Sequence, residues 1–187
     1  MKLQFRLFMV VLMLAAMPVK AADLFLSVKA GMFELKEDTF SSGAYGTTII
    51  DTASISSGAI GLEWLLRDKW MVGLEIYKMK HDWIAVGGET GDLESRLVVF
   101  SGKRLFNTDS VVQPYVGAGI GLVDMDFSTG DIWDNELASI VHLGGGVIFK
   151  FGDVAAYAET RYIEMLSTFA EYDYTGSGIY AGLRFGF

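Results

Sequence analysis

Residues 178–187 read Gly-Ile-Tyr-Ala-Gly-Leu-Arg-Phe-Gly-Phe and alternate between two kinds of side chain. One set is apolar and consists of Ile179, Ala181, Leu183, Phe185 and Phe187. The other set holds glycines together with Tyr180 and Arg184. Because successive side chains of a strand point to opposite faces, the stretch predicts a β-strand with one apolar face and one small or polar face.

Seven further segments predict strands, and most of them show the same alternation. They lie at about 24–33, 58–66, 70–80, 93–106, 113–122, 140–151 and 154–165. The segment 93–106 has apolar residues on both parities, so its faces stay unassigned. Short turns alternate with longer connections, and the longer ones lie at about 35–57, 81–92, 127–136 and 166–177.

The N-terminal residues have the pattern of a secretory signal. Lys2 and Arg6 precede an apolar run at 7–17, and Val19-Lys20-Ala21 offers small residues where a signal peptidase cleaves. The run is shorter than the roughly 20 residues of a membrane-spanning helix, which argues against the alternative of an uncleaved anchor. We therefore expect a signal peptide at 1–21 and one mature domain at 22–187.

The composition indicates a membrane protein built from strands. Hydrophobic residues make up 51% of the chain, yet beyond residue 17 no apolar stretch approaches the length of a spanning helix. In hydrocarbon every backbone N–H and C=O group must be paired, and besides helices only a closed barrel achieves this. The sequence therefore predicts an all-β, eight-stranded, antiparallel up-and-down transmembrane β-barrel.

A secreted lipocalin is the main alternative, because it is also an eight-stranded barrel but turns its apolar set toward an internal cavity. Two features favour lipid outside. Trp64 and Trp70 flank a short turn, as an aromatic girdle at a membrane interface would require, and glycines concentrate in the polar set.

Two stretches carry a residue-level resemblance to a known family. Residues 113–121, Gln-Pro-Tyr-Val-Gly-Ala-Gly-Ile-Gly, follow Phe106-Asn107-Thr108-Asp109 and resemble small bacterial outer-membrane barrels related to the OmpA transmembrane domain. The terminal residues 180–187 resemble the last strand of these proteins, and the single domain resembles the OmpX-like members.

The resemblance implies a location and partners. We expect the bacterial outer membrane, a periplasmic N-terminus, extracellular long loops, and contact with outer-membrane lipid and lipopolysaccharide. It also implies that the last strand is the signal read by the barrel-insertion machinery, through Ile179, Tyr180, Leu183, Phe185 and Phe187.

If lipid lies outside, the inward parity holds a set of charged residues: Glu63, Glu75, Glu159, Arg161 and Arg184. Unpaired charges in a narrow interior are costly, so we predict a carboxylate–guanidinium network with Lys29, His142 and Tyr180 as candidate further members. A plug is favoured over a gated polar path, because side chains fill an eight-stranded barrel.

Inward glycines cluster on two neighbouring predicted strands, at Gly117, Gly119, Gly121, Gly144 and Gly146. Two interpretations stay open. Tyr180, Arg184 and Phe33 could lean across from the last and first strands and fill the space by close packing, or the gap could be a small ligand cavity.

Several functions are disfavoured. The chain has no cysteine, hence neither disulfides nor a thiolate metal site, and its net charge of −8 disfavours nucleic acid as a partner. Neither histidine, His81 or His142, lies in a motif of the barrels that remodel lipid A, and no loop shows calcium-binding spacing.

We therefore predict a non-enzymatic, monomeric protein without cofactor or metal, in a structural or surface-interaction role. Its acidic loops are candidates for an extracellular protein partner. The second hypothesis is an OmpW-like channel for small or hydrophobic solutes, and the third a lipid A-modifying enzyme.

Overall fold

The computed structural model describes residues 24–35, 39–42, 46–49, 55–66, 69–84, 90–129, 132–166 and 175–187, so the expected signal peptide lies outside the described residues. The strands are β1 (Leu24–Leu35), β2 (Thr39–Ser42), β3 (Gly46–Ile49), β4 (Ile55–Leu66), β5 (Trp70–Ile84), β6 (Thr90–Leu105), β7 (Val112–Thr129), β8 (Ile132–Phe151), β9 (Val154–Met165) and β10 (Gly176–Gly186).

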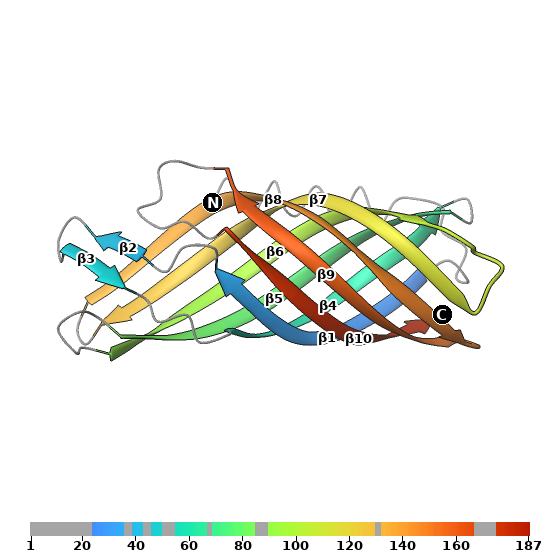
Figure 1. The fold of residues 1–187 in the computed structure, drawn as a ribbon, viewed down its shortest axis with the longest axis horizontal. Coiled ribbons are helices and arrows are strands. Elements are labelled where there is room, and N and C mark those ends of the chain that lie inside the picture. Colours follow the sequence, from blue (N-terminus) through green and yellow to red (C-terminus); the bar gives the residue numbers. More distant parts are fainter. Residues whose placement is uncertain are drawn as a thin grey trace.

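Eight of these strands close into one antiparallel barrel in the order β1-β10-β9-β8-β7-β6-β5-β4 (Figure 1). Chain neighbours pair with each other, and β1 closes the ring with β10 through a register that sets Ala30 opposite Ala181. The Phe187 amide donates to the Leu24 carbonyl at 3.1 Å, so the last residue is also tied to β1. The predicted eight-stranded up-and-down barrel is confirmed.

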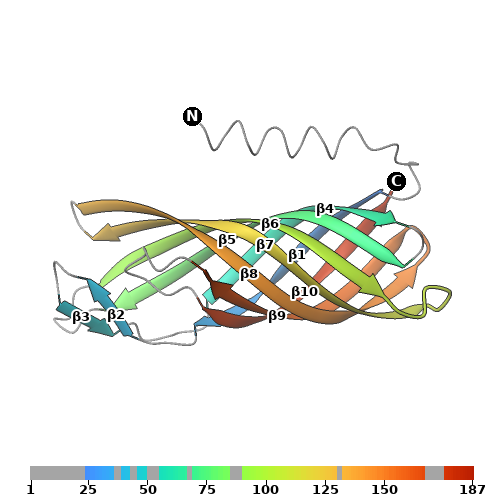
Figure 2. The same cartoon turned by 90° about the horizontal axis from the view of Figure 1, so that it is seen from above.

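Short turns join the strands at the end of the barrel where the C-terminus lies (Figure 2). Two of these turns contain a residue in the left-handed region, Asn107 with φ 53° and Gly152 with φ 71°. Asparagine and glycine tolerate this conformation better than other residues. The turn at 106–111 is further held by a hydrogen bond from the Ser110 amide to the Asn107 carbonyl, at 2.9 Å.

The opposite end of the barrel differs from the prediction. The prediction of a long connection at 127–136 is wrong, because β7 continues to Thr129 and β8 begins at Ile132. The first long connection contains an additional hairpin of β2 and β3, which lies at this end in Figures 1 and 2. The acidic residues Asp134 and Glu136 indicated a loop, but a strand that leaves the membrane can carry charge on either face.

The apolar set faces outward. Ile120 is 63% exposed, Leu143 63% and Ile179 72%, whereas inward residues such as His142 and Tyr180 are buried. This arrangement is the reverse of a lipocalin and matches a barrel surrounded by lipid. In the described part of the chain, no helix combines the length and hydropathy needed to cross a membrane.

The strand with unassigned faces, β6, turns its odd-numbered residues inward. Leu97, Val99 and Leu105 are buried together with Ser95, Ser101 and Lys103. The parity was ambiguous because this strand is apolar on both faces: its inward residues pack in the lumen, and Val98 and Phe100 lie on the wall.

Candidate functional site

The interior of the barrel contains a layer of seven ionisable side chains from six strands, which we call the charge layer. It consists of Lys29 (β1), Glu63 (β4), Glu75 (β5), Lys103 (β6), Glu159 and Arg161 (β9) and Arg184 (β10), none of them more than 5% exposed. The alternation of each strand positions them, because every one has the inward parity. The layer therefore links strands from all round the barrel.

Glu75 binds three cations. Its Oε1 atom lies 2.9 Å from Lys29 Nζ and 3.3 Å from Lys103 Nζ, and its Oε2 atom lies 2.8 Å from an Arg161 nitrogen. The Tyr77 hydroxyl donates a further hydrogen bond to Oε2 at 2.9 Å. Both oxygens of this carboxylate are thus fully used.

Glu159 forms the second centre of the layer. Its Oε1 atom lies 2.6 Å from Lys29 Nζ and 3.1 Å from an Arg161 nitrogen. The Tyr115 hydroxyl donates to its Oε2 atom at 2.6 Å. Lys29 and Arg161 therefore each connect Glu159 to Glu75.

Glu63 forms the third centre, on the side of the layer nearer the C-terminus. Lys103 Nζ lies 2.5 Å from one of its oxygens, and Arg184 Nε donates to the other at 2.9 Å. Arg184 Nη2 also donates to the Met71 sulfur at 2.9 Å. Lys103 thereby joins Glu63 to Glu75.

Aromatic rings line the same layer. Lys29 Nζ lies 4.8 Å from the centroid of the Tyr77 ring and 5.6 Å from that of Tyr180, and the Arg161 guanidinium lies 5.2 Å from Tyr77. The two rings themselves meet edge to face, with centroids 5.8 Å apart. Such contacts stabilise cations that have left water.

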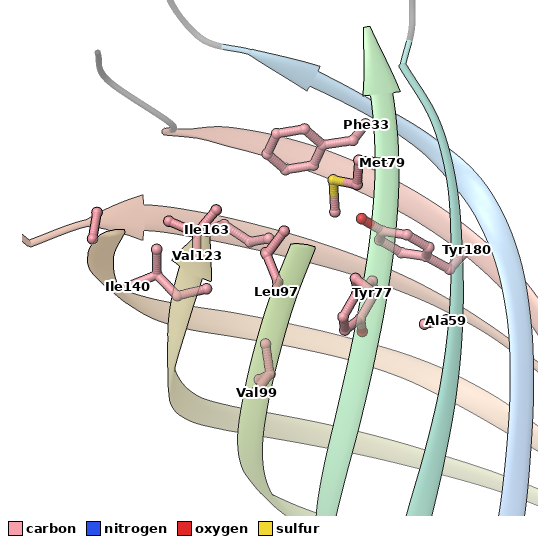
Figure 3. Close-up of a cluster of buried hydrophobic side chains, with 11 residues drawn as sticks. Phe33, Ala59, Tyr77, Met79, Leu97, Val99, Val123, Ile140, Ile163 and Tyr180 are labelled. Carbon is pink, nitrogen blue, oxygen red and sulfur yellow. The ribbon is translucent and has the colours of Figure 1, made fainter. Parts of the chain in front are cut away.

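Apolar side chains lie on both sides of the charge layer along the barrel axis. The distal cluster, away from the C-terminus, contains Phe33, Ala59, Tyr77, Met79, Leu97, Val99, Val123, Ala138, Ile140, Ile163 and Tyr180 (Figure 3). The proximal cluster contains Met71, Leu105, Tyr115, Ile148, Ala155 and Tyr157. On β5, for example, Met71 precedes Glu75 and Met79 follows it.

The structure brings the five predicted charged residues together and adds Lys29, which had been a candidate. Tyr180 joins through its ring, whereas neither ring nitrogen of His142 has a hydrogen-bond partner among the described residues. Lys103 was missed because the faces of its strand were unassigned. The short turn at 106–111 could have revealed the inward face of β6. It pairs Leu105 with Tyr115, whose face was already assigned, and Lys103 lies on the same face as Leu105.

The inward glycines of β7 and β8 are covered by side chains of the adjoining strands. A Cβ atom at Gly119 would meet His142 Nε2, one at Gly146 would lie 2.9 Å from Glu159 Cβ, and one at Gly117 would lie 3.0 Å from Lys103 Cγ. The atoms nearest to these positions come from the neighbouring strands and not from Tyr180, Arg184 or Phe33. The glycines give these longer side chains room against the wall.

No group of three or more histidine, cysteine, aspartate or glutamate residues in the described part of the chain is placed to bind a metal ion. The side chain of His81, one of the two histidines considered for catalysis, lies outside the described part of the structure. His142 lies in the lumen against Gly119, away from either end of the barrel.

A second charged cluster, the wall cluster, lies on the outside of β5 and β6. The Glu94 carboxylate is 2.9 Å from Lys78 Nζ and 3.1 Å from an Arg96 nitrogen. The Lys78 and Arg96 side chains are each 59% exposed and that of Glu94 is 24% exposed. On β5 the wall cluster follows the exposed residue Ile76, so it marks the end of the apolar wall on these strands.

Comparisons with known proteins agree with this geometry. Residues 7–186 match the family described as outer membrane protein beta-barrel domain. A search of curated proteins found no significant match.

Among solved structures, Neisserial surface protein A matches with a TM-score of 0.66 and 20% identity, over 88% of this chain and 97% of that one. Ail, the attachment invasion locus protein of Yersinia pestis, matches with 0.58 and 14%, over 89% and 99%. The N-terminal barrel of Pseudomonas aeruginosa OprF matches with 0.53 and 18%, over 88% and 98%. At these identities the likeness concerns the fold.

Proposed function

The chain belongs to the outer membrane protein beta-barrel domain family, and on that premise we propose that it is a non-enzymatic outer-membrane protein with a closed lumen and a structural or surface-interaction role. The observation that carries the proposal is the order of layers inside the barrel. The charge layer is enclosed between two apolar clusters, so a solute crossing the barrel would have to displace all three.

The charge layer supports a structural role because its parts depend on one another. Each carboxylate contacts at least two cations, and every contact except that between Arg161 and Glu159 joins different strands. Removing one partner of a buried pair leaves an uncompensated charge, which costs far more than the pair contributes. Such a layer favours a single strand register over alternatives.

Solute flux and lipid A chemistry, measured together on proteoliposomes of the full chain, test this proposal. We expect neither efflux of small or apolar solutes nor any change in co-reconstituted lipid A. Efflux would favour the OmpW-like channel, and altered lipid A would favour an enzyme. Either result contradicts the closed, non-enzymatic barrel.

For a surface role, the charge of the chain restricts the partner. Ail has been solved with the heparin analogue sucrose octasulfate, a strongly anionic ligand. The present chain carries a net charge of −8, and its connections are rich in acidic residues such as Glu37, Asp38, Asp51 and Glu171. Electrostatic complementarity therefore favours a basic protein partner over a sulfated glycan, and binding that weakens as salt is raised.

The insertion signal of the last strand remains part of the proposal. Ile179, Leu183 and Phe187 are exposed on the outer wall, whereas Tyr180 is buried in the distal cluster. We expect Phe187→Ala to reduce the amount of barrel assembled in the outer membrane of cells while leaving the stability of barrel refolded in detergent nearly unchanged. Phe106→Ala, which alters an exposed aromatic outside this strand, is the matched control.

Equal assembly of the two variants would contradict the signal. If Phe187→Ala lowered the stability of the refolded barrel in detergent as strongly as it lowered assembly in cells, Phe187 would have a packing role instead. Phe187 is 62% exposed, so we expect its packing to contribute little to the stability of the barrel.

A further inference from the structure

The charge layer does not balance. It contains four cations, Lys29, Lys103, Arg161 and Arg184, against the three carboxylates of Glu63, Glu75 and Glu159. These are all the Asp, Glu, Lys and Arg side chains that are buried in the described part of the chain. With every group ionised the layer holds one positive charge in excess, enclosed by two apolar clusters.

An excess charge in such surroundings is unfavourable. Transfer of an ion from water to a low-dielectric interior costs several kcal/mol even after the protein relaxes, unless a counter-charge accompanies it. The wall cannot supply the missing negative charge, since the other buried side chains are aliphatic, aromatic, thioether, hydroxyl, amide or histidine groups. A mobile anion from solution can supply it.

The deficit is greatest at Arg184. Lys29 and Arg161 each contact two carboxylates and Lys103 contacts three, whereas Glu63 is the one carboxylate within ion-pair distance of Arg184 in the described part of the chain. A guanidinium has five N–H donors, and the second acceptor that this one contacts is the Met71 sulfur. Thioether sulfur is a weak acceptor and carries no charge.

A second, independent observation points to the same place. Tyr157 is 5% exposed and its hydroxyl has no hydrogen-bond partner among the described residues. Tyr157 belongs to the same proximal cluster as Met71, which Arg184 contacts, and it pairs with Gly182, two residues before Arg184 on β10. A buried hydroxyl without an acceptor is costly, and an anion would accept its proton.

We propose that the lumen binds one small monovalent anion of halide size beside Arg184, with the Arg184 guanidinium and the Tyr157 hydroxyl as donors, and that this anion completes the charge layer. The site lies on the proximal side of the layer, where Met71 now contacts the guanidinium. The site does not require a surface partner or a channel, so the proposal is independent of the proposed function.

The test compares anions at constant ionic strength. The full chain is folded in detergent in sodium chloride or in sodium gluconate, whose anion is too large for a packed interior, and its thermal unfolding midpoint is recorded. We expect the midpoint to be lower by about 4 °C in gluconate, the scale on which loss of a bound ligand shifts a domain of this size. Equal midpoints in the two salts would overturn the proposal.

A charge-supplying variant sharpens the test. Met71→Glu places a carboxylate where the sulfur contacts Arg184, which brings the count to four against four, and Met71→Gln is the neutral control of the same shape. We expect the difference between chloride and gluconate to vanish in Met71→Glu and to persist in Met71→Gln. If the difference between chloride and gluconate persisted in both variants, the anion would act elsewhere, which would contradict the site.

If Met71→Glu fails to fold, crystals of the wild-type chain grown in bromide decide the matter. An anomalous bromide peak in contact with the Arg184 guanidinium supports the site. Its absence at full data completeness, or a bromide found only on the outer surface, overturns it.

Discussion

The charge layer and the wall cluster contain the same chemistry in two environments. In the lumen Lys29 and Glu75 lie 2.9 Å apart with side chains 1% exposed, and on the wall Lys78 and Glu94 lie 2.9 Å apart with side chains 59% and 24% exposed. Equal distances do not imply equal consequences. Water and salt can replace the partner of an exposed charge, but nothing replaces the partner of a buried one.

The largest expected effect comes from removing the central carboxylate of the layer. Glu75→Gln keeps the shape of the side chain but leaves Lys29, Lys103 and Arg161 without one of their counter-charges. We expect a loss of about 3–5 kcal/mol in the free energy of unfolding. Urea unfolding of the barrel in lipid vesicles measures it, and a loss as small as that of a wall variant would contradict the account.

A double-mutant cycle across Glu63 and Arg184 should show the next effect. Each single change, Glu63→Gln or Arg184→Gln, breaks the 2.9 Å pair and leaves one partner buried. We expect the double variant to be more stable than the sum of the single losses predicts, by about 0.5–3 kcal/mol. Strict additivity in the same unfolding assay would indicate that the two groups do not interact.

The glycines that accommodate the layer predict a smaller loss. A Cβ atom at Gly119 would meet the Phe100 carbonyl oxygen and His142 Nε2, so we expect Gly119→Ala to cost about 1–3 kcal/mol. Gly102 is the matched control, because a Cβ atom there meets nothing within 4 Å. If Gly102→Ala were as destabilising as Gly119→Ala, the loss would reflect strand glycines in general.

The smallest effect belongs to the wall cluster. Glu94→Gln removes the shared partner of Lys78 and Arg96, whose charges stay in contact with water. We expect the unfolding midpoint to change little, and the small difference from wild type to shrink further as salt is raised. A loss comparable to that of Glu75→Gln would remove the distinction between the two regions.

The barrel and most of the charge layer could be predicted from the sequence, because both follow from the alternation of inward and outward residues along each strand. A strand with one lipid-facing side reveals which residues point inward, and Glu63, Glu75, Glu159, Arg161 and Arg184 followed from it. Lys103 did not, since Leu97 and Val99 pack inside while Val98 and Phe100 face outward, and hydrophobicity alone cannot distinguish two apolar faces.

The ends of the strands were the other limit. Composition placed a loop at 127–136, where pairing of Asp126 with Asn135 and of Phe127 with Asp134 continues the ladder instead. Backbone hydrogen bonds do not require apolar side chains once a strand has left the membrane. Which side chain covers which glycine was also beyond the sequence, because it depends on the stagger between neighbouring strands.

The central claim is that the lumen is closed by a charge layer between two apolar clusters, and a planar-bilayer recording of the purified full chain tests it most directly. The account predicts no continuous conductance in the wild type. A continuous conductance of porin size in the wild type would contradict it.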